Sequence, residues 1–471
     1  MRISGNLMNH LKSLGNRLTK HRDLTKGPVF STMFFFALPM ILGNILQQGY
    51  NVVDTWVVGH YIGSKALAAV GSAFALMTFL TSFLLGLCMG SGVVFSLCFG
   101  RKDKKELEHS ICASFVLVTI IAFFLTVFSI ISVDVIIIWM NIPMEIIEIT
   151  KEYFILVFCG IPAIAIYNFF GAYLKAVGNS VVPLIFLGIS TLLNIVLDIL
   201  FVAVLYQGTF GAAVATIISQ YVSGIGIGIY VITKNSSIRN AFYQFKIKKS
   251  SLKEIANYSI LTCMQQSVMN LGILMVQGLV NSFGTAIMAA FAAAVKIDSF
   301  TYMPIQEYAN AFSTFIAQNV GAQKKGRMKQ GIHYAVISMV AYCCFASFVL
   351  WFLAKPLMQV FIDENEVMII TEGVRYLHTI GPFYCGIGCL FLFYGLYRAL
   401  GKPAMSVVLT VVSLGTRVAL SYTLAMLPSI GVAGIWWSIP IGWGLADLIG
   451  FLYYYKNVFN GLSQANNCIH E

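Results

Sequence analysis

The sequence predicts an all-α integral membrane protein with twelve transmembrane helices arranged in two six-helix lobes. Three observations support this prediction. Of the 471 residues, 58% are hydrophobic and only 10% are charged, whereas soluble proteins carry about a quarter of their residues as charges. Apolar runs of roughly the twenty residues needed to cross a hydrocarbon core recur along the chain. The second half of the chain also repeats the first.

The repeat is visible when the sequence is shifted against itself. Moved by 221 positions, the stretch Gly63–Ile111 falls on Gly284–Ile332 with several identical residues, Gly63 and Gly100 among them. Moved by 223 positions, Lys175–Gly178 falls on Arg398–Gly401. Self-similarity over such a length indicates the duplication of one structural unit.

Twelve stretches are apolar and long enough to cross a membrane as helices. A β-barrel is not expected, because its strands are runs of about ten residues in which apolar and polar side chains alternate. Each half holds six spans, so both halves start on the same side and should be related by a pseudo-twofold axis along the membrane normal. The predicted spans lie near residues 32–57, 66–97, 110–138, 150–174, 183–206, 211–233, 255–281, 286–318, 331–353, 368–397, 404–427 and 432–455.

Proline residues inside several spans predict bends, because each removes a backbone donor from the helix. They occur in both halves, and helices that bend can open and close a cavity. The prolines concerned are Pro39, Pro162, Pro304, Pro382 and Pro440.

The loops differ in charge from one side of the membrane to the other. Lysine and arginine cluster in the termini and in every second loop, as in Arg101–Lys105 and Lys324–Arg327. Positive loops face the cytoplasm, so both termini should be cytoplasmic in a bacterial cell (inner) membrane. We expect a cytoplasmic tail over residues 1–27, an N-terminal lobe over 28–245 and a C-terminal lobe over 246–471.

Composition excludes several other classes of protein. The net charge of +11 comes from short basic clusters beside spans, so no nucleic-acid partner is expected. The ten cysteines lack the spacing of a disulfide framework or a zinc site. There is no Gly-rich phosphate-binding loop, so an ATP-driven pump is not expected. The sequence predicts neither an enzyme nor a protein with a cofactor.

Ionisable residues inside the first-half spans are functional candidates, because a charge in hydrocarbon costs at least about 3 kcal/mol. Asp54 lies in the outer part of the first span and Asp198 in the fifth. Asn194 precedes Asp198 by one helical turn and shares its face. Thr216, in the sixth span, should lie at a similar depth.

Two carboxyl groups with an amide and a hydroxyl could serve as a site for a coupling ion. As a cluster of hard oxygens, Asp54, Asn194, Asp198 and Thr216 could hold Na⁺; as neighbouring carboxylates, the two aspartates could carry H⁺. The structural alternative is that these groups only form hydrogen bonds between helices, as polar residues of membrane bundles often do.

The second half carries a different set of charges. Lys296, Asp298 and Glu307 all lie in the eighth span, Arg417 lies in the eleventh and Asp447 in the twelfth. Asp298 is expected to face Arg417 or a water-filled cavity, and a structural ion pair is as well supported as binding of substrate or of a second cation.

Polar and aromatic residues should also line the substrate cavity. Gln265 and Gln266 in the seventh span and Tyr50 in the first are candidates for this lining. Such surfaces accept varied organic cations.

The sequence resembles the multidrug and toxic compound extrusion (MATE) family over nearly its whole length. The resemblance rests on the stretch FFFALPMILGNILQQGYNVVDTWVVGHYIG, on the repeated motifs LAAVG and MAAFA, on YLKAVGN with YRALGKP, and on AAAVKIDSFTYMP. Within the family the sequence is similar to the DinF-like branch, whose cation site matches Asp54, Asn194, Asp198 and Thr216. The acidic residue that the NorM-like branch places in the seventh span is replaced here by Gln265 and Gln266.

The resemblance implies a secondary antiporter that exports cationic or amphipathic organic compounds in exchange for H⁺ or Na⁺. We expect such a protein to act as a monomer in the lipid bilayer. The alternative is a flippase for a lipid-linked precursor, from the same broad superfamily. That function would favour a large cavity with several basic residues, whereas the spans hold few, with Lys296 and Arg417 as the candidates.

Overall fold

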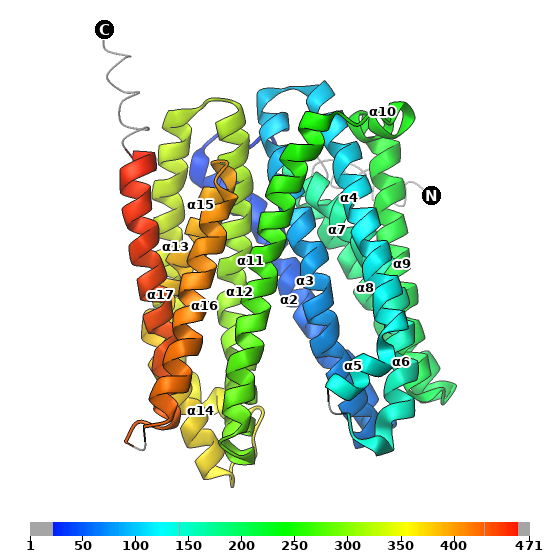
Figure 1. Cartoon of the computed structure of the whole chain (residues 1–471), viewed down its shortest axis with the longest axis vertical. Coiled ribbons are helices and arrows are strands. Elements are labelled where there is room, and N and C mark those ends of the chain that lie inside the picture. Colours follow the sequence, from blue (N-terminus) through cyan, green and yellow to red (C-terminus); the bar gives the residue numbers. More distant parts are fainter. Residues whose placement is uncertain (1–21, 141, 428, 460–471) are drawn as a thin grey trace, which may run out of the picture. The chain divides into compact units, whose positions relative to one another are not determined.

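The protein consists of long helices, as the sequence predicts. A computed structural model describes residues 22–140, 142–427 and 429–459, and nearly all of these residues are helical (Figure 1). Within these residues, twelve segments are long and apolar enough to cross a membrane. The prediction of an all-α integral membrane protein is therefore confirmed. Most of the predicted tail, residues 1–21, lies outside the described residues.

The chain divides into two compact units, and each contains six of the spans. The first unit comprises residues 34–259 together with the residues up to Lys26. Its helices are α2 (Val29–Tyr61), α3 (Ser64–Arg101), α4 (Lys104–Ile131), α5 (Val133–Trp139), η1 (Met144–Ile146), α6 (Ile147–Cys159), α7 (Ile161–Ala176), α8 (Val181–Asp198), η2 (Ile199–Val204), α9 (Gly208–Lys234) and α10 (Ser236–Gln244). The short helices α5 and α10 lie at opposite ends of this unit (Figure 1).

The second unit comprises residues 260–471 together with residues 27–33. Its helices are α11 (Lys249–Asn281), α12 (Thr285–Gly321), α13 (Lys325–Gln359), α14 (Val367–Ile380), η3 (Gly381–Phe383), α15 (Tyr384–Ala399), α16 (Pro403–Ala425), α17 (Val432–Tyr454) and η4 (Tyr455–Phe459). The division between the units falls inside α11, between Ser259 and Ile260. The boundary predicted near residue 245 lies in the short connection between α10 and α11.

The fourth span of each half is interrupted, and proline accounts for both interruptions. In the first half, α6 ends at Cys159 and α7 starts at Ile161, with Pro162 in its first turn. In the second half, the 3₁₀ turn η3 carries Pro382 and separates α14 from α15. Proline in a first turn needs no backbone donor, so it favours a new helix start. Pro39, Pro304 and Pro440 lie instead within the continuous helices α2, α12 and α17.

The repeat is also visible in the backbone, because related glycines in the two halves have positive φ angles. Positive φ angles are strained for residues with a Cβ and are the usual reason for glycine at a turn. Such angles occur at three pairs of glycines that the repeat relates, at equivalent helix boundaries of the two halves. The pairs are Gly63 (107°) with Gly284 (94°), Gly178 (84°) with Gly401 (80°), and Gly208 (61°) with Gly431 (54°).

Small residues allow helices of the first unit to pack closely. A Cβ on Gly90 of α3 would lie 2.5 Å from the backbone of both Tyr258 and Ser259 on α11. Beside this contact, the Ser91 hydroxyl lies 2.9 Å from the Ser259 hydroxyl and accepts a hydrogen bond from Ser114 Oγ at 2.7 Å. Close backbone approach with hydroxyl contacts is typical of helix pairs in membranes.

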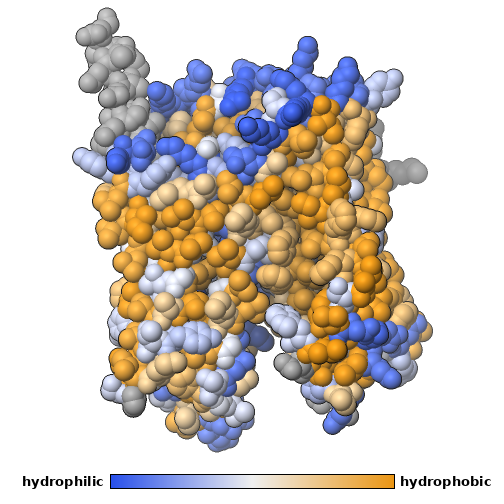
Figure 2. Space-filling view, viewed as in Figure 1, coloured by the Kyte–Doolittle hydropathy of each residue, from blue (hydrophilic) through white to orange (hydrophobic). Residues whose placement is uncertain are grey.

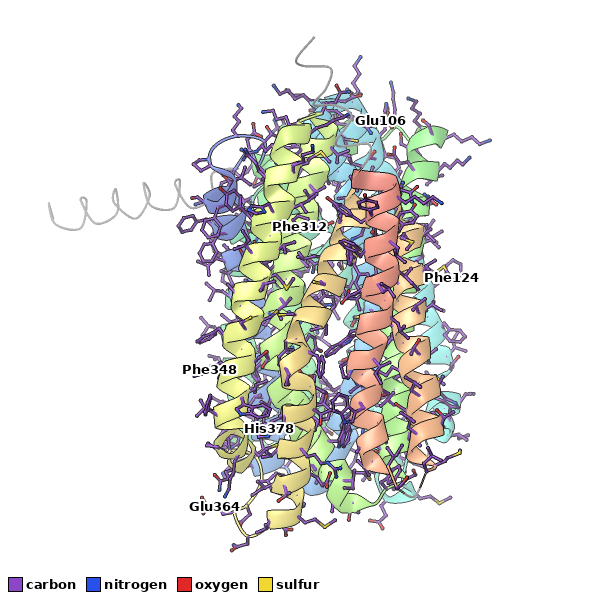
Figure 3. All side chains as sticks on the ribbon, turned by 90° about the vertical axis from the view of Figure 1, so that its left-hand side faces the viewer. Glu106, Phe124, Phe312, Phe348, Glu364 and His378 are labelled. Atoms are coloured by element: carbon purple, nitrogen blue, oxygen red, sulfur yellow. The ribbon has the colours of Figure 1, made fainter. Side chains whose placement is uncertain are left out.

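The surface is apolar where lipid would cover it. Hydrophobic residues dominate the middle of the visible face, and hydrophilic residues collect at its ends (Figure 2). Phe348 on α13 points away from the bundle and is 64% exposed, whereas Phe312 on α12 is 1% exposed inside it (Figure 3). Exposed phenylalanine on a long apolar helix is expected in a bilayer and would be costly in water.

Candidate functional site

The carboxyl groups of Asp54 and Asp198 lie together inside the first unit. Asp54 is in the C-terminal half of α2, and Asp198 is the last residue of α8. The two side chains are close enough to share a hydrogen bond. Asp198 has no solvent-exposed surface. Residues far apart in the sequence therefore form one acidic pair in the interior.

Asn194 connects this pair to α9. Its amide makes its best hydrogen bonds when Nδ2 donates to Asp198 Oδ2 at 2.8 Å and Oδ1 accepts from the backbone N–H of Thr216 at 3.3 Å. In the opposite orientation of the amide, Nδ2 donates to Thr216 Oγ1 at 3.4 Å. The spacing of one helical turn between Asn194 and Asp198 is what allows these two side chains to meet each other.

Tyr50 joins the same cluster from α2. Its hydroxyl lies 3.5 Å from Thr216 Oγ1, and it stands one turn before Asp54. The structure thus brings Asp54, Asn194, Asp198 and Thr216 together, and it adds Tyr50, which the sequence had associated with the substrate cavity.

Two oxygens of this cluster lack partners. Oδ1 of Asp54 and Oδ1 of Asp198 are both inaccessible to solvent and accept no hydrogen bond. A buried charged oxygen without a partner is costly, and either a bound cation or a proton would remove the cost. With the hydroxyls of Tyr50 and Thr216 nearby, the oxygen-rich donor set is of the kind that hard cations prefer.

The helix that carries Asp198 changes its winding directly after this residue. The segment η2 (Ile199–Val204) is π-helical, and short π-helical insertions in α-helices often occur at functional sites. The π-helical segment η2 therefore begins directly after Asp198, within the same membrane span.

Tyr153 is a member of the cluster that sequence reasoning missed. It lies on α6, it is 5% exposed, and it interacts electrostatically with Asp54, Tyr50 and Asp198. The repeat offers a signal that could have found it, because the shift of 223 positions places Tyr153 on Tyr376.

In the second unit, Tyr376 also faces a buried carboxylate. Its hydroxyl donates to Asp298 Oδ2 at 3.4 Å, and the Tyr384 hydroxyl donates to Asp298 Oδ1. The Arg417 guanidinium, one of the two surroundings that the sequence suggested for Asp298, interacts electrostatically with it. Within the described chain these two charges form no ion pair shorter than 4.0 Å.

Aromatic rings pack beside this carboxylate. The ring of Trp436 stacks on Phe291 at 5.3 Å and meets Tyr376 edge-on at 5.0 Å. Trp436 has no exposed surface, and Phe291 and Tyr376 are each 2% exposed. The rings therefore form a closed core that reaches Asp298 through Tyr376.

The remaining predicted residues of the second unit lie apart from Asp298. Glu307 accepts a hydrogen bond from Asn310 at 3.3 Å, and Asn310 accepts one from Arg398 at 3.2 Å. Nine residues separate Glu307 from Asp298, which is about 13 Å along a helix. Lys296 is exposed. Gln265 and Gln266 are buried on α11, and Oε1 of Gln265 has no partner.

The described residues form twelve candidate membrane spans, and each six-span unit holds a polar cluster in its interior. These two features together are typical of a polytopic membrane transporter rather than an enzyme. Comparison with known proteins identifies the kind of transporter. The model of the MatE family matches residues 39–200 and 259–423, which is more than half of the chain. The protein therefore belongs to the MatE family.

Relatives match along almost the whole chain. The "Probable multidrug resistance protein YpnP" of Bacillus subtilis is 28% identical over 438 residues, which cover 92% of this chain and 97% of the relative. The "Probable multidrug resistance protein NorM" of Thermotoga maritima is 26% identical and covers 85% of this chain and 86% of its own. The "Multidrug export protein MepA" of Staphylococcus haemolyticus is 22% identical, with 91% and 94% covered.

Solved structures share the fold. A transporter of the MOP superfamily from Pyrococcus furiosus superposes with a TM-score of 0.88 at 22% identity and covers 94% of this chain and 99% of its own. A structure described as the outward-facing conformation of a multidrug resistance MATE family transporter gives the same TM-score, identity and coverage. The assignment to the DinF-like branch stays a prediction.

Proposed function

We propose that the protein is a secondary antiporter that exports cationic or amphipathic organic compounds in exchange for H⁺ or Na⁺ at the Asp54–Asp198 pair. The observation that carries this proposal is the pairing of two interior carboxyl groups, each with one oxygen that has no partner. The names of the relatives, which are multidrug resistance and multidrug export proteins, support the class of cargo.

The energetics require a coupling ion. Moving one positive charge outward against the membrane potential costs about 2.3 kcal/mol per 100 mV. One entering H⁺ or Na⁺ offsets that cost. For the two movements to be linked, the ion and the compound must bind differently to the inward- and outward-open states.

The Asp54–Asp198 pair provides a physical link of this kind. When the ion is absent, two negative charges lie side by side in the interior and repel each other. When it is bound, α2, α8 and α9 can close around a neutralised site. The packing of three spans then depends on occupancy, which is the property that coupling needs.

The substitution Asp198→Asn tests this function. Asparagine keeps the size of the side chain and removes its charge, so the variant should fold in the membrane and lose ion-driven efflux of ethidium. The measurement is dye transport by proteoliposomes under an imposed pH or Na⁺ gradient. Asp134→Asn is the matched control, because Asp134 is an exposed residue on α5 that pairs with Lys151. Normal ion-driven efflux by the Asp198→Asn variant would remove the pair from the mechanism.

A further inference from the structure

Asp447 is a carboxyl group in the middle of a span of the second unit, and the site described above does not use it. It lies on α17, fifteen residues after the start of that helix at Val432 and seven before its end. Its side chain is half-buried, and its Oδ1 atom is inaccessible to solvent and has no hydrogen-bond partner among the described residues. On the described part of the chain, no lysine, arginine or histidine forms an ion pair with it.

The neighbours of Asp447 are poor partners for a negative charge. Asp447 Oδ2 lies 3.6 Å from where a Cβ on Gly386 of α15 would be, beside Trp443 of its own helix. The titratable groups that interact with it are Cys389 and Tyr394, also on α15. Neither is a cation.

The other elements packed against α17 place their charged groups farther away. Arg417 of α16 packs on Gly442, which is more than one turn from Asp447, and its electrostatic partners are Tyr376, Asp298 and Tyr302. Tyr376 of α14 meets α17 at Trp436, about 16 Å along the helix from Asp447. Lys456 of η4 is exposed beyond the end of α17.

Asp298, in the same unit, is a carboxylate that does have stabilising partners, and it provides the comparison for Asp447. It accepts hydrogen bonds from two tyrosines and has a guanidinium nearby. Asp447 has none of these, although both lie within spans. An ionised carboxylate without partners is the costliest arrangement in a membrane interior, and a proton removes that cost directly.

The surroundings also determine which cation fits. A hard metal ion needs several oxygen ligands around it. The groups near Asp447 are the Gly386 backbone position, the Trp443 side chain, the Cys389 thiol and the Tyr394 hydroxyl. A single hydroxyl oxygen among them does not form an oxygen cage. A proton requires only the carboxyl oxygen itself.

We propose that Asp447 is a proton-binding site of the second unit, which takes up and releases a proton during transport in addition to the ion bound at Asp54 and Asp198. This inference rests on the proposed antiport, because the released proton would contribute to the driving force for export. The protonation of Asp447 can nevertheless be tested without transport.

Infrared difference spectroscopy of the full chain in lipid vesicles at neutral pH tests the protonation. A protonated carboxyl group has a carbonyl band that a carboxylate lacks. We expect a band in the wild-type protein that is lost in Asp447→Asn and retained in Asp134→Asn, the variant of an exposed outer carboxylate. An unchanged band in a folded Asp447→Asn protein would overturn the proposal.

A second measurement uses the wild-type protein and does not depend on the folding of a variant. Dicyclohexylcarbodiimide adds a protonated carboxyl group across its C=N bond, with the oxygen on carbon and the proton on nitrogen. Mass spectrometry should find the adduct at Asp447 and not at Asp298. An adduct at Asp54 or Asp198 without one at Asp447 would contradict the proposal.

The role in transport is tested by counting protons. Proteoliposomes loaded with a pH-sensitive dye should show fewer protons moved per ethidium in Asp447→Asn, because one linked binding step is removed: about half as many if the ion at Asp54 and Asp198 is H⁺, and none if it is Na⁺. Efflux should persist in this variant. An unchanged ratio would remove Asp447 from coupling, whereas loss of coupling in Asp198→Asn alone would leave the proposed antiport intact.

Discussion

The carboxyl group of Asp54 on α2 lies within hydrogen-bonding reach of the carboxyl group of Asp198 on α8. Two neighbouring acids cannot both stay ionised without cost in an interior of low dielectric constant. The charge of the pair therefore changes when a cation or proton binds in the first unit. The predictions about coupling rest on this change.

The Thr216 hydroxyl should distinguish Na⁺ from H⁺ as the coupling ion. Thr216→Val keeps the shape of the side chain and removes one oxygen ligand. If the ion is Na⁺, the concentration for half-maximal efflux should rise about tenfold, which corresponds to about 1.4 kcal/mol. If the ion is H⁺, the pH dependence should stay nearly unchanged. The measurement is ethidium efflux from proteoliposomes over a series of Na⁺ concentrations and pH values.

Thr233→Val is the control for this experiment. The Thr233 hydroxyl lies on the same helix and is bonded to the backbone of its own preceding turn, so its loss should not alter ion dependence. Complete loss of efflux in Thr216→Val under both gradients, with normal folding, would contradict the assignment of Thr216 to ion ligation alone.

Gly90 should be essential to the packing of α3 against α11. A Cβ at this position would lie 2.5 Å from backbone atoms of Tyr258 and Ser259, and backbone atoms cannot yield as a flexible side chain can. Gly90→Ala should therefore lower the apparent unfolding temperature in detergent. Gly71→Ala is the matched control on the same helix, because nothing lies within 4 Å of its Cβ position, and it should be neutral or stabilising by up to about 1 kcal/mol. Equal stability of the two variants would show that the contact at Gly90 relaxes freely.

Asp298 should stabilise the second unit through Arg417. Asp298→Asn leaves the half-buried Arg417 guanidinium without its neighbouring negative charge and two tyrosine hydroxyls without a charged acceptor, and a hydrogen bond to a charged group is worth about 1.5–3 kcal/mol. We expect a lower unfolding temperature for this variant and partial recovery in the double variant Asp298→Asn with Arg417→Gln. If the double variant is no more stable than Asp298→Asn, the two charges do not stabilise each other.

Trp436 should stabilise the same region by packing rather than by its polar atom. Its Nε1 atom is buried without a partner, while its ring stacks on Phe291. Trp436→Ala should cost about 3–5 kcal/mol, whereas Trp436→Phe keeps a stacked ring and removes an unsatisfied donor, so it should cost less. Thermal unfolding of the two variants measures the difference, and a larger loss in Trp436→Phe than in Trp436→Ala would contradict this account.

Much of the architecture could be predicted because it depends on local sequence. An apolar run of sufficient length is helical in a membrane whatever its neighbours are, since every backbone group must bond within the segment. The twelve spans and their division into two groups of six were therefore accessible from hydropathy and from the repeat. The close spacing of Asn194 and Asp198 on one helix face was accessible for the same reason.

Which side chains meet across helices depends on how each helix is rotated and how closely it packs, and sequence periodicity leaves these open. The convergence of Tyr50 and Tyr153 on Asp54, the bonding of Glu307 to Asn310 rather than to a site near Asp298, and the two tyrosines on Asp298 came only from the tertiary structure. The residue types and their depth in the membrane are properties of the sequence. Whether a carboxyl group within a span finds a hydrogen-bond donor among the described residues, as Asp298 does and Asp447 does not, is decided by packing, because only packing sets the distance to the nearest donor.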